Sequence, residues 1–199
     1  MSLSVVSSAD EVESRLHDTG ALLRGHFLLS SGLHSDQYIQ CARLLSHPQH
    51  AEFVGQALAA AYRASGLPPI DVVLGPALGG IVVAHEVARA LGVRALFAER
   101  DAGVLTLRRG FALSPGERVL IVEDVITTGG SAVETAALAQ EHGAQIAGYA
   151  AIVERGSDHG LQPLFALWRV RPQLFPATAC PLCQAGSPAV KPGSRTQPR

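Results

Sequence analysis

Two adjacent carboxylates and a loop rich in hydroxyl groups and glycine stand close together in one stretch of this sequence. Glu123 and Asp124 follow the apolar run Val119–Val122, and two spacers separate them from the loop Thr127-Thr128-Gly129-Gly130-Ser131. The N–H groups of such a loop can hold a phosphate, because glycine allows close approach and a following helix adds the positive end of its dipole. Carboxylates repel phosphate, so we expect Glu123 and Asp124 to face ribose hydroxyls, hydrated Mg²⁺ or a developing positive charge.

A second glycine-rich turn precedes the first motif by one strand and helix. Its sequence is Leu74-Gly75-Pro76-Ala77-Leu78-Gly79-Gly80. Glycine–proline and glycine–glycine pairs occur in many turns, so this segment alone is a weak signal. Its place before the first motif favours a second anion-binding turn.

Short apolar runs alternate with helical patterns through the middle of the chain. We expect strands at 71–74, 95–98, 119–122 and 145–153, helices at about 48–65, 80–91 and 131–143, and an edge strand at 164–170. This alternation predicts an α/β fold with a central, mostly parallel sheet covered by helices on both faces. The carboxyl ends of parallel strands are where open α/β sheets bind ligands, and the acid pair lies at such an end.

Composition narrows the class of protein. The chain has 199 residues, 47% of them hydrophobic, which suits one globular domain. A net charge of −1 argues against a nucleic-acid-binding surface, and no apolar run is long enough to span a membrane. With no apolar leader and three cysteines, we expect a cytoplasmic protein. Lys191 is the only lysine, so we expect arginine to supply the cationic groups of the folded domain.

The domain limits follow from the breaks in this pattern. We expect a single domain over residues 1–185, with a small N-terminal hood at about 20–45 that contains short strands around Ser30-Ser31-Gly32. The long glycine- and arginine-containing connection at about 99–115 is typical of a mobile lid. Residues 186–199 are rich in Pro, Gly and Ser and are predicted to be a disordered tail.

The stretch from Val119 to Ser131 closely resembles the PRPP-binding signature of the type I phosphoribosyltransferases. The resemblance implies that Thr127–Ser131 hold the 5-phosphate, that Glu123 and Asp124 contact the ribose hydroxyls directly or through Mg²⁺, and that the spacers Val125 and Ile126 belong to the same PRPP site. It also implies that Mg²⁺ is held by PRPP and water rather than by direct protein ligands. In this family the turn Pro76-Ala77-Leu78-Gly79 faces the pyrophosphate.

Three further segments are similar to bacterial orotate phosphoribosyltransferases. They are Gly25–Ser35 in the hood, Ile152-Val153-Glu154-Arg155 at a strand end, and Cys180-Pro181-Leu182-Cys183 followed by Lys191-Pro192-Gly193-Ser194. The resemblance implies transfer of ribose 5-phosphate from PRPP to orotate, with Thr127 and Arg155 contacting the base. A guanidinium suits the orotate carboxylate, although a surface ion pair would also explain Arg155. Tyr38 either stacks over the base or simply packs.

The lid departs from the family pattern. Phe97-Ala98-Glu99-Arg100-Asp101 resembles its start, but Arg100 stands where the family has lysine, and the further lid lysine and histidine have no counterpart in Ala102–Leu105. Gly79 and Ser30 replace two other family lysines. The resemblance implies PRPP binding by Arg100 and catalytic roles for Arg100, Glu123 and Asp124, with Arg108 and Arg109 as the remaining cations able to compensate. It also implies a homodimer with shared active sites.

Several alternatives stay open. A purine phosphoribosyltransferase would share both phosphate loops, and a non-catalytic PRPP-sensing regulator would share the fold, although such a regulator usually has a nucleic-acid-binding surface. A dinucleotide-binding dehydrogenase domain is disfavoured, because the sequence lacks the G-x-G-x-x-G pattern after a first strand. Cys180-x-x-Cys183 is a packed turn, half of a zinc site or a redox pair; Cys41 is distant in sequence and His159 is the nearest histidine upstream.

Overall fold

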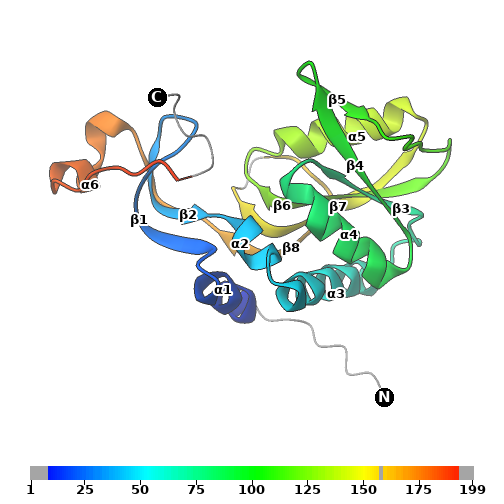
Figure 1. Cartoon of the computed structure of the whole chain (residues 1–199), viewed down its shortest axis with the longest axis horizontal. Helices are drawn as coiled ribbons and strands as arrows, with labels where there is room; N and C mark the ends of the chain where they lie inside the picture. Colours follow the sequence, from blue (N-terminus) through cyan, green and yellow to red (C-terminus); the bar gives the residue numbers. More distant parts are fainter. Residues whose placement is uncertain (1–8, 157–158, 193–199) are drawn as a thin grey trace.

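The computed structural model describes residues 9–156 and 159–192, which form two sheets (Figure 1). The larger sheet has the order β5-β4-β3-β6-β7-β8, and its strands pair in parallel except at β4–β5. The strands are β3 (Val72–Pro76), β4 (Arg94–Asp101), β5 (Val104–Leu107), β6 (Arg118–Ile126), β7 (Gln145–Arg155) and β8 (Leu164–Val170). The predicted α/β fold with a mostly parallel sheet is confirmed.

Helices cover both faces of this sheet. The longer ones are α1 (Ala9–Asp18), α3 (Pro48–Ala64), α4 (Gly79–Leu91) and α5 (Gly130–Glu141), and α2 (Cys41–Leu45) is a short helix beside α3. Figure 1 shows α3 and α4 on one face and α5 on the other. Among the described helices none is long and apolar enough to cross a bilayer.

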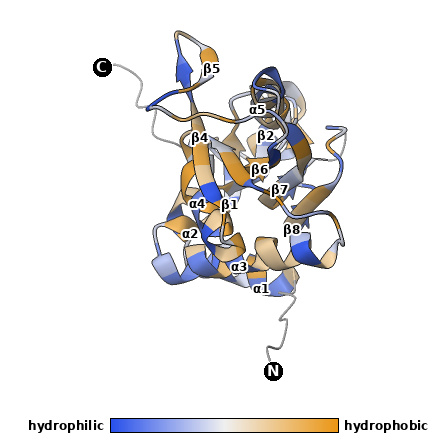
Figure 2. Ribbon diagram, turned by 90° about the vertical axis from the view of Figure 1, so that its right-hand side faces the viewer, coloured by the Kyte–Doolittle hydropathy of each residue, from blue (hydrophilic) through white to orange (hydrophobic). Residues whose placement is uncertain are grey.

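The strands bury residues on both faces, as continuous apolar runs predict. In β3, Val73 packs into the cluster on the α3–α4 face, whereas its neighbours Val72 and Leu74 pack into the cluster under α5. Hydrophobic colouring accordingly occupies much of the central strands in Figure 2. Two cores therefore hold the sheet rigidly, and the loops at its carboxyl edge start from fixed positions.

The hood is a second, three-stranded sheet built from both ends of the chain. Its strands are β1 (Leu22–Leu28), β2 (His34–Ile39) and β9 (Leu174–Phe175), in the antiparallel order β1-β2-β9. After β9 come a 3₁₀ turn (Ala177–Ala179) and α6 (Pro181–Gln184). The Val190 amide donates to the carbonyl of His26 and the Leu28 amide donates to the carbonyl of Val190, both at 2.8 Å.

Three expectations differ from this structure. Val190 is hydrogen-bonded to β1, so the segment 186–192 is ordered against the hood rather than a free tail, while 193–199 lie outside the described residues. The predicted lid is in part a β-hairpin, since Asp101 pairs with Val104 across a tight turn. Strand β6 continues to Ile126 through its pairing with β7, so the two acids lie within the strand and not after it.

Candidate active site

A cavity of about 650 Å³ lies between the hood and the carboxyl edge of the large sheet. The hood contributes apolar residues and Tyr38, and the sheet contributes Thr127, Thr128, Arg155 and Gly156. The segment after β8 and the end of the described chain complete the wall with Arg171, Pro172, Leu174, Lys191 and Pro192. A mostly apolar cavity with a few converging polar groups is the usual form of a small-molecule site.

The loop predicted to hold a phosphate connects β6 to the first turn of α5. Gly129 caps the helix with φ +77°, a left-handed conformation that glycine adopts without strain. The first helical hydrogen bond runs from the Val133 amide to the Gly129 carbonyl, so the Gly130 and Ser131 amides precede it and have no intrahelical acceptor. Thr127, Thr128, Gly130 and Ser131 are exposed. The loop can therefore offer amides and hydroxyls to an anion.

The two acids lie half-buried just before this loop. Burial, with a further contribution from the charge of Asp124, raises the pKa of Glu123 to about 7. Burial also raises the pKa of Asp124, although the Val125 amide, which donates to Asp124 Oδ1 at 2.9 Å, partly offsets that rise. Each carboxylate is costly to ionise here without a positive partner, so the pair favours a cationic or hydroxyl-bearing ligand.

The two glycine-rich turns meet at Asp124. A Cβ added to Gly79 would lie 2.6 Å from Asp124 Oδ1, which is closer than any real Cβ contact. Gly79 opens α4 directly after the turn Pro76-Ala77-Leu78, whose Leu78 side chain is 83% exposed. The absence of a side chain at Gly79 thus brings the second turn against the acid pair, so that one ligand can span both.

Arg155 is at the end of β7 and lines the cavity. Its Nη2 donates to Ser35 Oγ of the hood at 3.3 Å, and burial lowers the pKa of its guanidinium despite the opposing charges of Tyr38 and Asp36. Among the described ion pairs, none includes Arg155. A half-buried cation with no carboxylate at ion-pair distance among residues 9–156 and 159–192 favours an anionic ligand.

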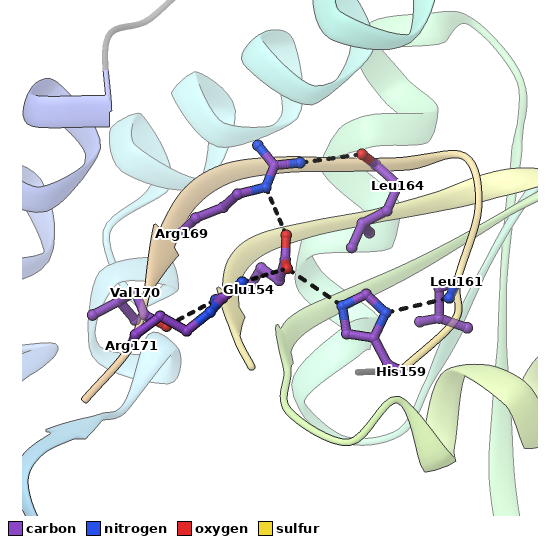
Figure 3. Close-up of polar contacts among 7 residues, drawn as sticks. All are labelled: Glu154, His159, Leu161, Leu164, Arg169, Val170 and Arg171. Atoms are coloured by element: carbon purple, nitrogen blue, oxygen red, sulfur yellow. Dashed lines mark hydrogen bonds and ion pairs between the residues drawn. The ribbon is translucent and has the colours of Figure 1, made fainter. Parts of the chain in front are cut away.

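The neighbouring Glu154 connects three segments of the chain: the end of β7, the segment around His159 and the end of β8 (Figure 3). Its carboxylate is 8% exposed and accepts from Arg169 Nε at 2.7 Å and Arg171 Nη2 at 3.2 Å, with His159 Nε2 at 3.4 Å. Burial alone would raise the pKa of Glu154, but the hydrogen bonds from these three side chains bring it below its usual value. Glu154 thereby fixes Arg171 in the cavity wall and His159 against Gly129 of the loop before α5.

The hairpin predicted as the lid does not line this cavity. Arg100 makes a bidentate ion pair with Glu134 of α5, with Nη2 2.5 Å from Oε2. Arg109 pairs with Glu99 at 2.7 Å, and Arg108 lies 4.0 Å from Asp101. The three lid arginines are thus held by acids outside the cavity, and the structure does not bring Arg100 to the Glu123–Asp124 pair.

Sequence reasoning missed two cations of the cavity wall. Lys191 was expected in a disordered tail, and arginine alone was expected to act inside the domain, yet Lys191 lines the cavity together with Arg171. The signal for Lys191 was weak, because a Pro- and Gly-rich segment gives no strand pattern. The bridge between Phe27 and Val190, which places it, joins residues at opposite ends of the chain.

Comparison with known proteins adds an independent finding. Residues 41–162 match the family model of the phosphoribosyl transferase domain. The chain is 50% identical over 193 residues to the orotate phosphoribosyltransferase of Heliobacterium modesticaldum, covering 95% of this chain and all of the relative. It is 51% identical over 189 residues to that of Pelotomaculum thermopropionicum, covering 94% and 97%. The crystal structure of orotate phosphoribosyltransferase from Aeropyrum pernix superposes with a TM-score of 0.69 at 26% identity, covering 80% of this chain and 93% of that chain.

Proposed function

We propose how this site divides between two substrates, one in the cavity and one along the carboxyl edge of the sheet, on the premise that this chain belongs to the orotate phosphoribosyltransferase family. The reaction joins orotate to the ribose 5-phosphate of PRPP, forms orotidine 5′-monophosphate and releases pyrophosphate, a pentosyl transfer of pyrimidine biosynthesis. The assignments of residues to each substrate are the proposal.

Orotate occupies the part of the cavity between the hood and the end of β7. The observation that carries this assignment is Arg155, a half-buried guanidinium that lines the cavity and forms none of the described ion pairs. Its planar fork matches the orotate carboxylate in shape and charge, and Thr127 is on the same wall to contact the base. Leu28, Leu29 and Leu33 of the hood close an apolar cover over a flat ring. That cover would also exclude water from the reacting carbon.

PRPP lies along the carboxyl edge of the sheet. The exposed amides and hydroxyls of Thr127–Ser131 bind its 5-phosphate at the start of α5, with Val125 and Ile126 setting the loop's position. Glu123 and Asp124 contact the ribose hydroxyls, and Pro76–Gly79 faces the pyrophosphate. This arrangement agrees with the contact between Gly79 and Asp124, which puts the two turns within reach of one molecule.

Mg²⁺ fits this arrangement as the cofactor. The acid pair offers oxygen donors, which this ion prefers, and no cation of the described part of the chain is among the groups that shift either pKa. Held chiefly by PRPP oxygens and water, the ion would neutralise pyrophosphate charge. The chain's own groups then align the two reactants and orient the ribose, which requires no protein nucleophile.

The protein acts as a homodimer with shared active sites. Arg100, which is ion-paired to Glu134 and lies outside the cavity of its own chain, acts on pyrophosphate in the neighbouring site of a homodimer. One domain comprises the hood, the sheet and the C-terminal segment to at least Pro192. Its compartment is the cytoplasm, where reduced cysteines such as Cys41, Cys180 and Cys183 persist.

The test is a product assay. Protein, PRPP and Mg²⁺ are mixed with orotate, adenine or hypoxanthine, and the nucleotide formed is separated and identified. We expect orotidine 5′-monophosphate from orotate and no product from the purines. Consumption of a purine base, with orotate unreacted, would reverse the assignment in favour of a purine phosphoribosyltransferase.

A paired substitution tests the base contact. Arg155→Gln should raise the KM for orotate about 10- to 100-fold, on the scale of losing a charged hydrogen bond, and change the KM for PRPP only slightly. Arg89→Gln, on the exposed face of α4, is the matched control. An unchanged KM for orotate in Arg155→Gln would remove Arg155 from the base site.

A further inference from the structure

Two histidines of the hood meet the two cysteines of the C-terminal segment. His26 is on β1, His34 is on β2, and Cys180 and Cys183 flank the start of α6. Their ligand atoms (one nitrogen of each imidazole and both Sγ atoms) lie within 4.8 Å of one another. Figure 1 shows α6 beside the hood, away from the large sheet.

The separations match those of a tetrahedral zinc site. Zn–N bonds of about 2.0–2.1 Å and Zn–S bonds of about 2.3 Å at tetrahedral angles place neighbouring nitrogen and sulfur ligands about 3.6 Å apart. In the structure His26 Nε2 is 3.4 Å from Cys180 Sγ and 3.7 Å from Cys183 Sγ, and His34 Nδ1 is 3.4 Å from Cys183 Sγ. The two imidazole nitrogens are closer, at 2.7 Å, and must separate by about 0.6 Å to admit the ion.

His26 is already oriented for metal binding by a second hydrogen bond. Its Nδ1 lies 2.8 Å from the carbonyl oxygen of Ser187, which can only accept, so Nδ1 carries the proton. Nε2 therefore presents its lone pair to the other three groups. A ligating histidine that donates its second N–H to a carbonyl is the common arrangement around protein-bound zinc.

Burial also distinguishes this cluster from a surface group. The exposed fractions are 5% for His26, 7% for His34 and 1% for Cys180, while Cys183 closes the cluster on the solvent side. Such polar groups are rarely buried together without a shared partner. The His–Cys contacts are long, weak hydrogen bonds, so they offset only part of that cost.

We propose that His26 Nε2, His34 Nδ1, Cys180 Sγ and Cys183 Sγ bind one structural Zn²⁺ ion. Binding takes a proton from each of the two thiols and requires both coordinating nitrogens to be unprotonated. With four protein ligands the site is closed and has no position for a substrate, so the ion does not take part in ribosyl transfer. The zinc site itself does not rest on the proposed function, whereas its effect on the KM for orotate rests on the proposed orotate site.

The ion would link the hood to the C-terminal segment, since Cys180 lies 154 residues after His26 in the sequence. That segment continues from Cys183 to Val190, which pairs with β1, and to Lys191 and Pro192 in the cavity wall. Zinc would therefore hold this part of the cavity wall in place without contacting the substrates. Its loss should loosen this wall and raise the KM for orotate more than it lowers kcat.

Metal content of the purified full-length protein is the direct test. Protein purified without chelator or metal-affinity resin should contain about one zinc per chain by elemental analysis, as expected of a closed site. Cys183→Ser, at the solvent edge, should lose the zinc, and Cys183→His should retain it because histidine is also a zinc ligand. Cys41→Ser is the control, since Cys41 is buried on α2 and is not part of the cluster.

A spectroscopic measurement on the unaltered chain keeps the test independent of variant folding. Zinc is removed with a chelator under reducing conditions, and Co²⁺ is added. Sulfur-to-cobalt charge-transfer absorption together with the strong visible bands of a four-coordinate ion is the expected result. A wild-type protein that carries no zinc and gives no such spectrum would overturn the proposal, as would a Cys180–Cys183 disulfide in freshly purified protein. Retention of orotate transfer in a zinc-free protein with unchanged KM would refute the role in holding the cavity wall.

Discussion

Replacing Glu123 by Gln should change how the stability of this protein depends on pH. Burial beside Asp124 raises the pKa of the Glu123 carboxyl from 4.5 to about 7 in the folded chain. Between these two values the folded state holds a proton that the unfolded state has released. The contribution of Glu123 to stability is therefore fully present below pH 4.5 and is lost as pH rises to about 7.

The size of the effect follows from the two pKa values. Each unit of difference corresponds to about 1.4 kcal/mol, and integrating the proton binding of one such group gives a loss of about 2.5 kcal/mol between pH 5 and pH 8. Glutamine resembles the protonated carboxyl and does not titrate. The free energy of unfolding of Glu123→Gln, measured relative to wild type, should thus rise by about this amount over the same range.

Urea denaturation at pH 5, 6, 7 and 8 in the absence of ligands measures this difference. Glu141→Gln is the matched control, because Glu141 is exposed at the end of α5 and the substitution makes the same change of charge. A constant difference between wild type and Glu123→Gln across this pH range would refute the account of a buried, reluctantly ionised carboxyl. In wild type, PRPP with Mg²⁺ should bind more tightly as pH rises through about 7, because ionised Glu123 is the form that suits such a ligand.

Three further substitutions test other parts of the site. Gly79→Ala places a methyl group against the Asp124 carboxylate and should raise the KM for PRPP by about 10-fold or more, because a displacement of about 1 Å in a site can cost that much. Unchanged steady-state kinetics would show that the contact between Gly79 and Asp124 is unimportant. Arg100→Ala should lower kcat about 10²-fold at saturating substrates, and a kcat equal to wild type would exclude Arg100 from the mechanism. Glu154→Gln weakens the ion pairs with two half-exposed arginines, which water already screens, and should lower the free energy of unfolding at pH 7 by about 1–2 kcal/mol. Because the pKa of Glu154 is lowered in the folded state, this difference in unfolding free energy should shrink as the pH falls below the pKa of an ordinary glutamate. A difference that does not depend on pH would contradict the role of the Glu154 charge.

The parts of the site that depend on local sequence could be predicted. The run from Val119 to Ser131 contains a buried strand, an acid pair and a glycine loop within a few residues, and the structure contains that strand with the loop directly before α5. The large sheet could be predicted for the same reason, because each apolar run corresponds to one strand that is buried by helices on both faces.

Contacts between distant parts of the chain could not be predicted in this way. Cys180 and Cys183 suggested half of a metal site, and the nearest upstream histidine, His159, instead contacts Glu154. The histidines that complete the cluster lie on β1 and β2, and only the folding of the C-terminal segment onto the hood brings them there. Nothing in the spacing of single histidines among strand residues distinguishes a ligand from a packing residue.

The construction of the hood from both ends of the chain affects the order of events during protein synthesis. The sheet and its helices can acquire their cores once β8 has left the ribosome, while β1 and β2 still lack the strand and the bridge that complete their sheet. The cavity wall that Leu174, Lys191 and Pro192 complete forms only when residues 174–192 have emerged. A nascent chain that stalls or is truncated in this last stretch would therefore present a folded core whose cavity lacks one of its walls.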